Sequence, residues 1–116
     1  MRINSADDYQ ALARRTQSCK TKEDRARHGV FGLTSEAGEV AVTWYLIRQK
    51  KYQGHSIDRE YMAKELGDCL WMIAEICDAF GLSLAEVMGK NIEKLRERYP
   101  DGFEAEKSLH RKDGDI

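Results

Sequence analysis

The sequence predicts an all-α fold, a helical bundle of about four helices. Proline occurs once, at Pro100, and strand-favouring residues form few runs. Apolar residues recur instead at the spacing of amphipathic helices, and hydrophobic residues make up 41% of the chain, enough for a packed core. A length of 116 residues suits one domain. We therefore expect a single domain over residues 1–116, with a polar tail at 104–116 that is partly disordered.

The first two predicted helices cover residues 5–18 and 24–52. Ser5 is suited to cap the first helix, and two aspartates follow it at the positive end of the helix dipole. Arg14 is expected on the solvated side of this helix. The second predicted helix is apolar on two faces and therefore needs two packing partners. In so short a chain we expect one of them to be another subunit.

The last two predicted helices cover residues 57–80 and 83–98, after a turn at 53–56. Gly81 is expected to end the third helix, because glycine readily adopts the left-handed conformation found there. Ser83 begins a capping box with a glutamate three residues later, which predicts the start of the fourth helix.

Two stretches of the pattern acid, apolar residue, glycine, acid lie in the second and third predicted helices. Residues three apart share a helix face, so each stretch projects two carboxylates together. The first acid of each stretch falls within the apolar arc of its helix, and the second lies at the edge of that arc. Two such helices packed side by side are expected to bring four carboxylates together: Glu36, Glu39, Glu65 and Asp68.

Four converging carboxylates require protons, basic partners or a cation. Two like charges about 4 Å apart repel by about 4 kcal/mol at an effective dielectric of about 20, whereas a domain is stable by about 5–15 kcal/mol. Hard oxygen ligands favour Mg²⁺, or Mn²⁺ as a substitute, over zinc. Gly38 and Gly67 recur at one motif position, which predicts a close approach to the backbone there. The alternative is a set of solvated salt bridges to the basic residues Arg48, Lys64, Lys90 and Arg98.

The fourth predicted helix carries polar groups in its apolar stripe. Asn91 and Arg98 fall at the centre of the stripe, and Lys94 falls at its margin. Arginine binds phosphate oxygens with a bidentate fork, lysine acts as a point charge, and Mg²⁺ binds through carboxylates together with substrate phosphates. The chain lacks the glycine-rich motif of a P-loop. These features predict a phosphorylated substrate held without a P-loop.

Charge and composition argue against several other classes. The net charge of −1 gives no bulk attraction to nucleic acid or to an anionic membrane. The apolar runs are far shorter than the roughly 20 residues that span a bilayer, and the amino terminus lacks a signal-peptide core. Three cysteines without zinc-like pairing are typical of inert thiols in a reduced cytoplasm. We therefore expect a cytoplasmic protein with no nucleic-acid or membrane partner, and a lone surface histidine at His28.

Three blocks in this order resemble the MazG-like nucleotide pyrophosphohydrolases of the all-α NTP pyrophosphatase superfamily: residues 32–40, 64–71 and 90–103. The first two blocks contain Glu-Ala-Gly-Glu and Glu-Leu-Gly-Asp, and the third ends Arg-Tyr-Pro-Asp-Gly-Phe. Many members carry a glutamate where this chain has Ser35, which leaves the number of bound metals open. The resemblance implies that the metal ligands are Glu36, Glu39, Glu65 and Asp68. It also implies that the substrate contacts are Asn91, Lys94, Arg98 and Tyr99.

The activity implied by this resemblance is Mg²⁺-dependent hydrolysis of a nucleoside triphosphate, NTP or dNTP, by a homodimer or homotetramer. A metal-activated water would attack the α-phosphorus, leaving a monophosphate and pyrophosphate. Glu39, at the edge of its arc, is the expected proton acceptor, and Lys94 and Arg98 would neutralise charge on the leaving pyrophosphate. Two alternatives stay open. One is a non-catalytic helical oligomeric regulator, and the other is a hydrolase of another nucleotide phosphoanhydride with the same metal site.

Overall fold

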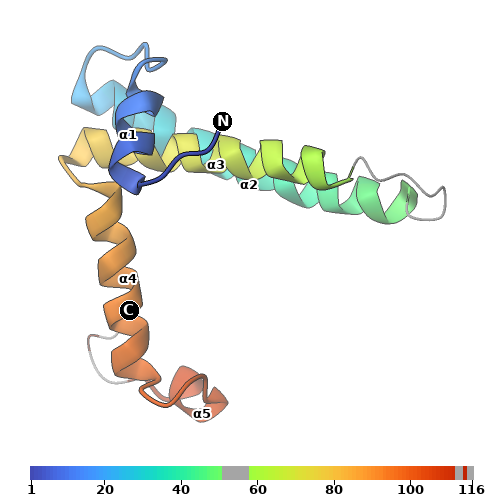
Figure 1. Cartoon of the computed structure of the whole chain (residues 1–116), viewed down its shortest axis with the longest axis vertical. Helices are drawn as coiled ribbons and strands as arrows, with labels where there is room; N and C mark the ends of the chain where they lie inside the picture. Colours follow the sequence, from blue (N-terminus) through green and yellow to red (C-terminus); the bar gives the residue numbers. More distant parts are fainter. Residues whose placement is uncertain (51–57, 112–113, 115–116) are drawn as a thin grey trace. The chain divides into compact units, whose positions relative to one another are not determined.

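The computed structural model describes residues 1–50, 58–111 and 114, and it confirms the all-α prediction. The helices are α1 (Ala6–Arg14), α2 (Lys22–Lys50), α3 (Asp58–Phe80), α4 (Leu84–Arg98) and α5 (Ala105–Leu109) (Figure 1). No strand occurs among the described residues. The turn predicted at 53–56, and the helix ends predicted at 52 and 57, lie outside them. The chain divides into two compact units, Met1–Leu84 and Ala85–Ile116.

The start of α1 and the end of α3 follow the predicted capping signals. The Ser5 hydroxyl accepts a hydrogen bond from the Asp8 N–H at 3.0 Å at the start of α1. α1 ends at Arg14, earlier than predicted, because the next three residues donate their N–H groups to carbonyls three positions back. Gly81, with a φ of 65°, ends α3 as expected. The Leu82 N–H donates to the Cys77 carbonyl at 2.8 Å, which completes a Schellman motif.

Helix α5 forms the first part of the polar tail at 104–116, which was expected to be partly disordered. The Lys107 ammonium lies 3.3 Å from the Glu104 carboxylate, and the His110 N–H donates to the Glu106 carbonyl at 2.9 Å. A short helix therefore forms in this polar segment through local hydrogen bonds and one ion pair. The segment gave no apolar periodicity from which a helix could be predicted.

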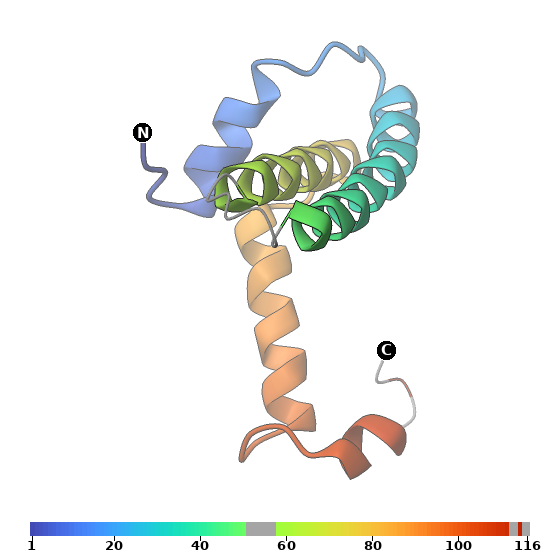
Figure 2. The ribbon, with the colours of Figure 1, turned by 90° about the vertical axis from the view of Figure 1, so that its right-hand side faces the viewer.

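In the first unit, α3 lies between α1 and α2, and α2 runs antiparallel to α3 along most of its length (Figure 2). Two glycines on α2 permit this packing. A Cβ atom on Gly29 would lie 2.7 Å from Cγ1 of Ile76, and one on Gly32 would lie 2.7 Å from Cε of Met72. Beyond their own helices, nothing described lies within 4 Å of the corresponding point at Gly38 or Gly67. The close approach predicted at those two positions therefore occurs at Gly29 and Gly32 instead.

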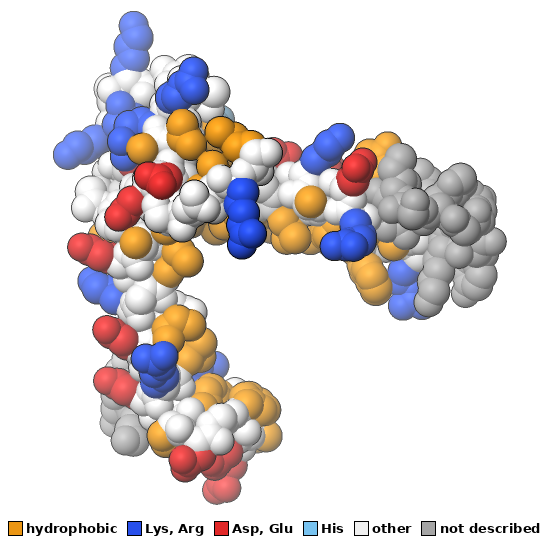
Figure 3. Space-filling view, in the orientation of Figure 1, with side chains coloured by type: hydrophobic (Ala, Val, Ile, Leu, Met, Phe, Trp, Pro, Cys, Tyr) orange, Lys and Arg blue, Asp and Glu red, His pale blue; other side chains and the backbone are white. Residues whose placement is uncertain are grey.

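The buried apolar core of the described residues is small, and its members are Ala13, Ala74, Cys77, Ala79 and Leu84. Large apolar side chains remain exposed along α2 and α3, among them Phe31 at 70%, Tyr45 at 62% and Trp44 at 55% (Figure 3). Among the described residues, no helix has both the length and the apolarity needed to cross a bilayer. The second apolar face predicted for α2 is thus open to solvent in the single chain.

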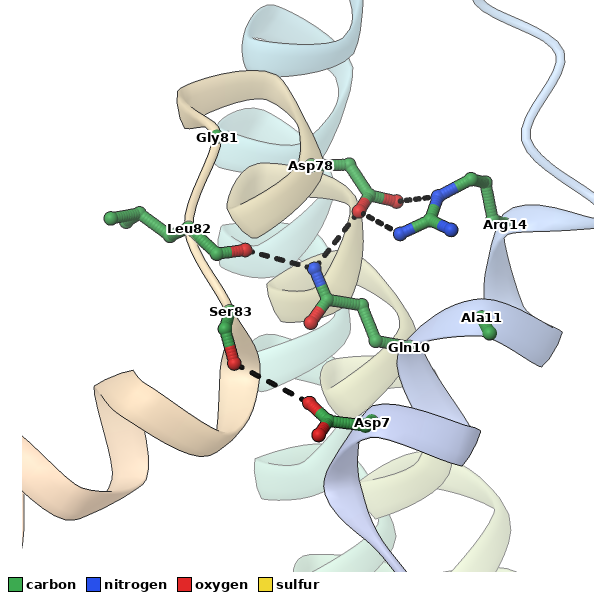
Figure 4. Close-up of a pocket in the computed structure, with 8 residues that line it drawn as sticks. All are labelled: Asp7, Gln10, Ala11, Arg14, Asp78, Gly81, Leu82 and Ser83. Carbon is green, nitrogen blue, oxygen red and sulfur yellow. Dashed lines mark hydrogen bonds and ion pairs between the residues drawn. The ribbon is translucent and has the colours of Figure 1, made fainter.

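A polar network joins α1 to the end of α3 (Figure 4). Arg14 contacts both carboxylate oxygens of Asp78, so the expectation that Arg14 is simply solvated is wrong. The Gln10 amide donates to Asp78 and to the Leu82 carbonyl, each at 2.9 Å, and its oxygen accepts from the Leu84 N–H at 2.8 Å. Burial alone would raise the pKa of Asp78. Hydrogen bonds from Arg14, Gln10 and Gln17, with the Arg14 charge, outweigh burial and lower that pKa.

Candidate metal and substrate site

The structure brings three of the four predicted acids together. Glu36 comes from α2, and Glu65 and Asp68 come from successive turns of α3. One carboxylate oxygen from each lies within 4.8 Å of the other two. Glu36 and Glu65 are half-buried, and Asp68 is exposed. We call these three residues the acid cluster.

Glu39 stands outside the acid cluster, although it was expected to converge with the other three. It follows Glu36 by three residues, which is about 4.5 Å along the helix axis and about 60° around it. Its side chain is exposed, whereas that of Glu36 is half-buried. Its charge still contributes to raising the pKa of Glu36. Glu39 is therefore a neighbour of the cluster with a more open carboxylate.

Burial and repulsion between acids both raise pKa values in and around the acid cluster. Burial raises the pKa of Glu36 first, and Asp68, Glu65 and Glu39 raise it further in that order. The thiol pKa of Cys69 is raised by burial and then by the charges of Glu36, Asp68 and Glu65. Burial raises the pKa of Tyr9, and Asp68 adds to this effect. Burial is the largest cause of each shift, and the smaller part that comes from the neighbouring acids reflects repulsion that a bound cation would relieve.

The donor chemistry of the cluster fits a hard divalent cation. All three groups offer carboxylate oxygens and none offers nitrogen or sulfur, the ligand set of Mg²⁺ or Mn²⁺. Two basic residues considered as salt-bridge partners are engaged with aromatic rings instead. Lys64 Nζ lies 5.7 Å from the Tyr61 ring centroid, and Arg48 Cζ lies 5.8 Å from that of Trp44.

The predicted substrate contacts lie on the second unit. Asn91, Lys94 and Arg98 are spaced by three and four residues on α4 and therefore share one face of the helix. Arg98 Cζ lies 5.7 Å from the Tyr99 ring centroid, and the Tyr99 ring lies 5.1 Å from that of Phe103. The guanidinium of Arg98 therefore lies beside the Tyr99 ring, which in turn contacts the Phe103 ring. Within this unit, an amide and two cations are therefore presented along one face of α4.

The sequence model of the MazG nucleotide pyrophosphohydrolase domain matches residues 30–103, well over half of the chain. The chain belongs to this family. The Gene 37 protein of Mycobacterium phage L5 is 32% identical over 73 residues, which cover 62% of this chain and 64% of that protein. The match therefore spans less than two thirds of this relative's length. No solved structure matched the chain.

A second group of side chains, two of which precede the matched residues 30–103, was not predicted. His28, expected as a lone surface histidine, contacts the carboxylate of Glu75 through Nδ1. Glu75 is completely buried, and Cys19 completes the group, in which one ligand atom from each residue lies within 4.8 Å of the others. One signal was available in the sequence. Glu75 follows Asp68 by seven residues, two helical turns, and so lies on the same side of α3.

Proposed function

We propose that this MazG-family chain hydrolyses nucleoside triphosphates, NTP or dNTP, to a monophosphate and pyrophosphate in the presence of Mg²⁺. The family is one of nucleotide pyrophosphohydrolases, hydrolases that act on phosphoric anhydrides. The observation that carries the finer proposal is the convergence of Glu36, Glu65 and Asp68 at the junction of α2 and α3. An oxygen-only cluster is the ligand set through which Mg²⁺ binds together with substrate phosphates.

The proposed roles follow from the chemistry of each side chain. The acid cluster would hold Mg²⁺, or Mn²⁺ in its place, with Glu39 as a further ligand. When bound, the cation supplies charge neutralisation at the phosphates and lowers the pKa of a coordinated water. On the second unit, Lys94 would bind phosphate as a point charge and Arg98 as a bidentate fork. Asn91 and Tyr99 would complete the substrate contacts.

The chemical step proposed is attack of water on the α-phosphorus. Glu39 takes the proton from this water as the new phosphorus–oxygen bond forms. Its exposed carboxylate, which stands outside the acid cluster, suits this role better than the half-buried Glu36. The bond from the α-phosphorus to the bridging oxygen breaks, and Lys94 and Arg98 stabilise the charge that builds on pyrophosphate.

We further propose that the active form is a homodimer or homotetramer. Phe31, Val42 and Tyr45 lie within about 60° of one another around α2, at 100° per residue, and all three are exposed in the single chain. A second copy packed on this face would give α2 the second partner that its two apolar faces require. A cytoplasmic location belongs to the same proposal, because Cys19, Cys69 and Cys77 are free thiols.

The experiment that tests the proposed reaction is hydrolysis of an NTP and dNTP panel in ¹⁸O-labelled water, with and without Mg²⁺. We expect pyrophosphate as the product and the label in the monophosphate, with no turnover after chelation. Release of orthophosphate, label in the pyrophosphate, or no turnover at any Mg²⁺ concentration would contradict the proposal. A nucleotide sugar or other phosphoanhydride in the panel that turns over faster than every triphosphate would overturn the choice of substrate.

A further inference from the structure

Cys19, His28 and Glu75 form a cluster with a donor set unlike that of the acid cluster. Cys19 lies in the segment between α1 and α2, His28 lies on α2, and Glu75 lies on α3. One thiol sulfur, one imidazole nitrogen and one carboxylate oxygen lie within 4.8 Å of one another. We call these three residues the thiol cluster.

Glu75 provides independent evidence that a ligand belongs at the thiol cluster. Its side chain is 0% exposed, and one oxygen contacts Nδ1 of His28. The other oxygen, Oε2, is buried without a hydrogen-bond partner among the described residues. An unsatisfied buried carboxylate oxygen is costly and rare in native proteins unless a proton, a water or an ion satisfies it.

We propose that Cys19, His28 and Glu75 bind Zn²⁺ or a divalent cation with the same ligand preferences. Sulfur, imidazole nitrogen and carboxylate oxygen are the three ligand types of protein zinc sites, whereas Mg²⁺ prefers oxygen alone. Tetrahedral zinc with bonds of about 2.0–2.3 Å needs ligand atoms about 3.5 Å apart. The His28 nitrogen and the Glu75 oxygen, which are in direct contact, would therefore have to separate around the cation. His28, with a side chain 49% exposed, gives the cation access from solvent. The fourth position is left to water.

The two clusters lie at different positions along the same pair of helices. Glu75 is seven residues beyond Asp68 on α3, about 10 Å along the helix axis. His28 is eight residues before Glu36 on α2, about 12 Å along its axis. Because the helices are antiparallel, both shifts run in the same direction. A thiophilic cation would therefore occupy the thiol cluster and Mg²⁺ the acid cluster, because their ligand preferences differ.

The surroundings of the thiol cluster already hold its ligands in place. The Arg25 guanidinium donates to the Cys19 carbonyl at 3.0 Å. The Trp71 ring meets the His28 ring edge-on, with centroids 6.0 Å apart, and Trp71 Nε1 donates to the Thr16 hydroxyl at 2.9 Å. A bound cation would tie the segment that carries Cys19 to α2 and α3, and would therefore stabilise the first unit.

The test uses Co²⁺ as a spectroscopic substitute for zinc, added to the full chain in excess Mg²⁺ so that oxygen-only sites are filled. We expect one equivalent of Co²⁺ to give a thiolate-to-cobalt charge-transfer band, which an oxygen-only site does not produce. Zn²⁺ is expected to displace the band and to raise the thermal midpoint. Cys19→Ser should lose the band, and the matched Cys69→Ser should keep it.

Three results would overturn the proposal: no thiolate band at one equivalent, a band that survives Cys19→Ser, or a band lost in Cys69→Ser. Circular dichroism establishes that each variant is folded. His28→Ala, at a half-exposed position, provides a second variant if Cys19→Ser does not fold. Loss of this ligand should weaken Zn²⁺ binding at least about 10–100-fold, the loss typical of a mutated partner that only orients a zinc ligand. Unchanged affinity in His28→Ala would equally exclude the site.

Discussion

Arg14 on α1 and Asp78 near the end of α3 form an ion pair, with Nη2 2.7 Å from Oδ1 and Nε 3.2 Å from Oδ2. Asp78→Asn should lower the free energy of unfolding by about 1.5–3 kcal/mol, the usual contribution of hydrogen bonds to a charged group. Asp24→Asn is the control, because Asp24 pairs with Arg27 in an exposed helical pair of small value. Equal stability of Asp78→Asn and the wild type in urea titrations would contradict this role of the network.

The same ion pair sets a pH dependence of stability. The pKa of Asp78 is lowered in the folded protein, so its contribution is complete above the ordinary carboxyl pKa of about 3.9. It is lost as the pH falls through the lower folded pKa. The difference in thermal midpoint between wild type and Asp78→Asn should therefore shrink below about pH 4. A difference that stays constant down to complete protonation would show that the pair does not act through its charge.

Activity and stability should move in opposite directions when the acid cluster loses a charge. The pKa of Glu36 is raised in the folded protein, so ionisation of Glu36 lowers the free energy of unfolding. This loss of stability develops as the pH rises from the ordinary carboxyl pKa toward the higher pKa of the folded state. Glu65→Gln should therefore raise the thermal midpoint in EDTA at neutral pH. It should also lower turnover by more than about 100-fold, because metal catalysis supplies several kcal/mol.

Glu60→Gln, at an exposed position of the same helix, is the control for these opposite effects of Glu65→Gln on stability and turnover. It should leave both the midpoint in EDTA and the turnover close to those of the wild type. The regulator alternative gives a different pattern, since acids held in interface salt bridges would make Glu65→Gln destabilising and EDTA without effect. The two measurements together separate the enzyme from the regulator.

Local signals in the sequence predicted most of the fold. Ser5 and Gly81 mark helix ends through capping groups within a few residues of one another. The spacing of Glu65 and Asp68 fixed one side of the acid cluster. The contacts of Arg14 with Asp78 and of His28 with Glu75 join residues 64 and 47 positions apart. Such pairs depend on the axial register of one helix against another, which periodicity alone does not determine.

The close packing of α2 against α3 depends on Gly29, and substitution of this residue should therefore lower the stability. Gly29→Ala would place a Cβ atom 2.7 Å from Ile76 and 3.3 Å from the Met72 carbonyl. The resulting overpacking should cost about 1–3 kcal/mol, which exceeds the gain of up to about 1 kcal/mol in helix propensity. Gly38→Ala, where the space is open, should instead stabilise α2. Thermal melts of the two variants should therefore shift in opposite directions, and a stable Gly29→Ala would contradict the close packing.

The shape of the Arg98 guanidinium, and not only its positive charge, should contribute to kcat/KM. Arg98→Lys keeps the charge but removes the bidentate fork and the stacking on Tyr99. If this group binds phosphate in the proposed way, kcat/KM should fall about 10–100-fold, since a charged hydrogen bond contributes about 1.5–3 kcal/mol. Arg96→Lys, at an exposed position two residues earlier, should change kcat/KM little. Equal effects of the two substitutions would remove Arg98 from the substrate site.

The exposed apolar face of α2 should determine the oligomeric state. Burying large apolar side chains contributes about 1.5–3 kcal/mol each, so three on one face approach the roughly 8 kcal/mol of a micromolar complex before the costs of association. Phe31→Glu should therefore convert the proposed dimer or tetramer to monomer in sedimentation measurements, because its side chain is 70% exposed on this face. Lys20→Glu adds negative charge at an exposed position before α2 and should leave the assembly intact. A wild-type chain that sediments as a monomer at high concentration would exclude this face as an interface between copies.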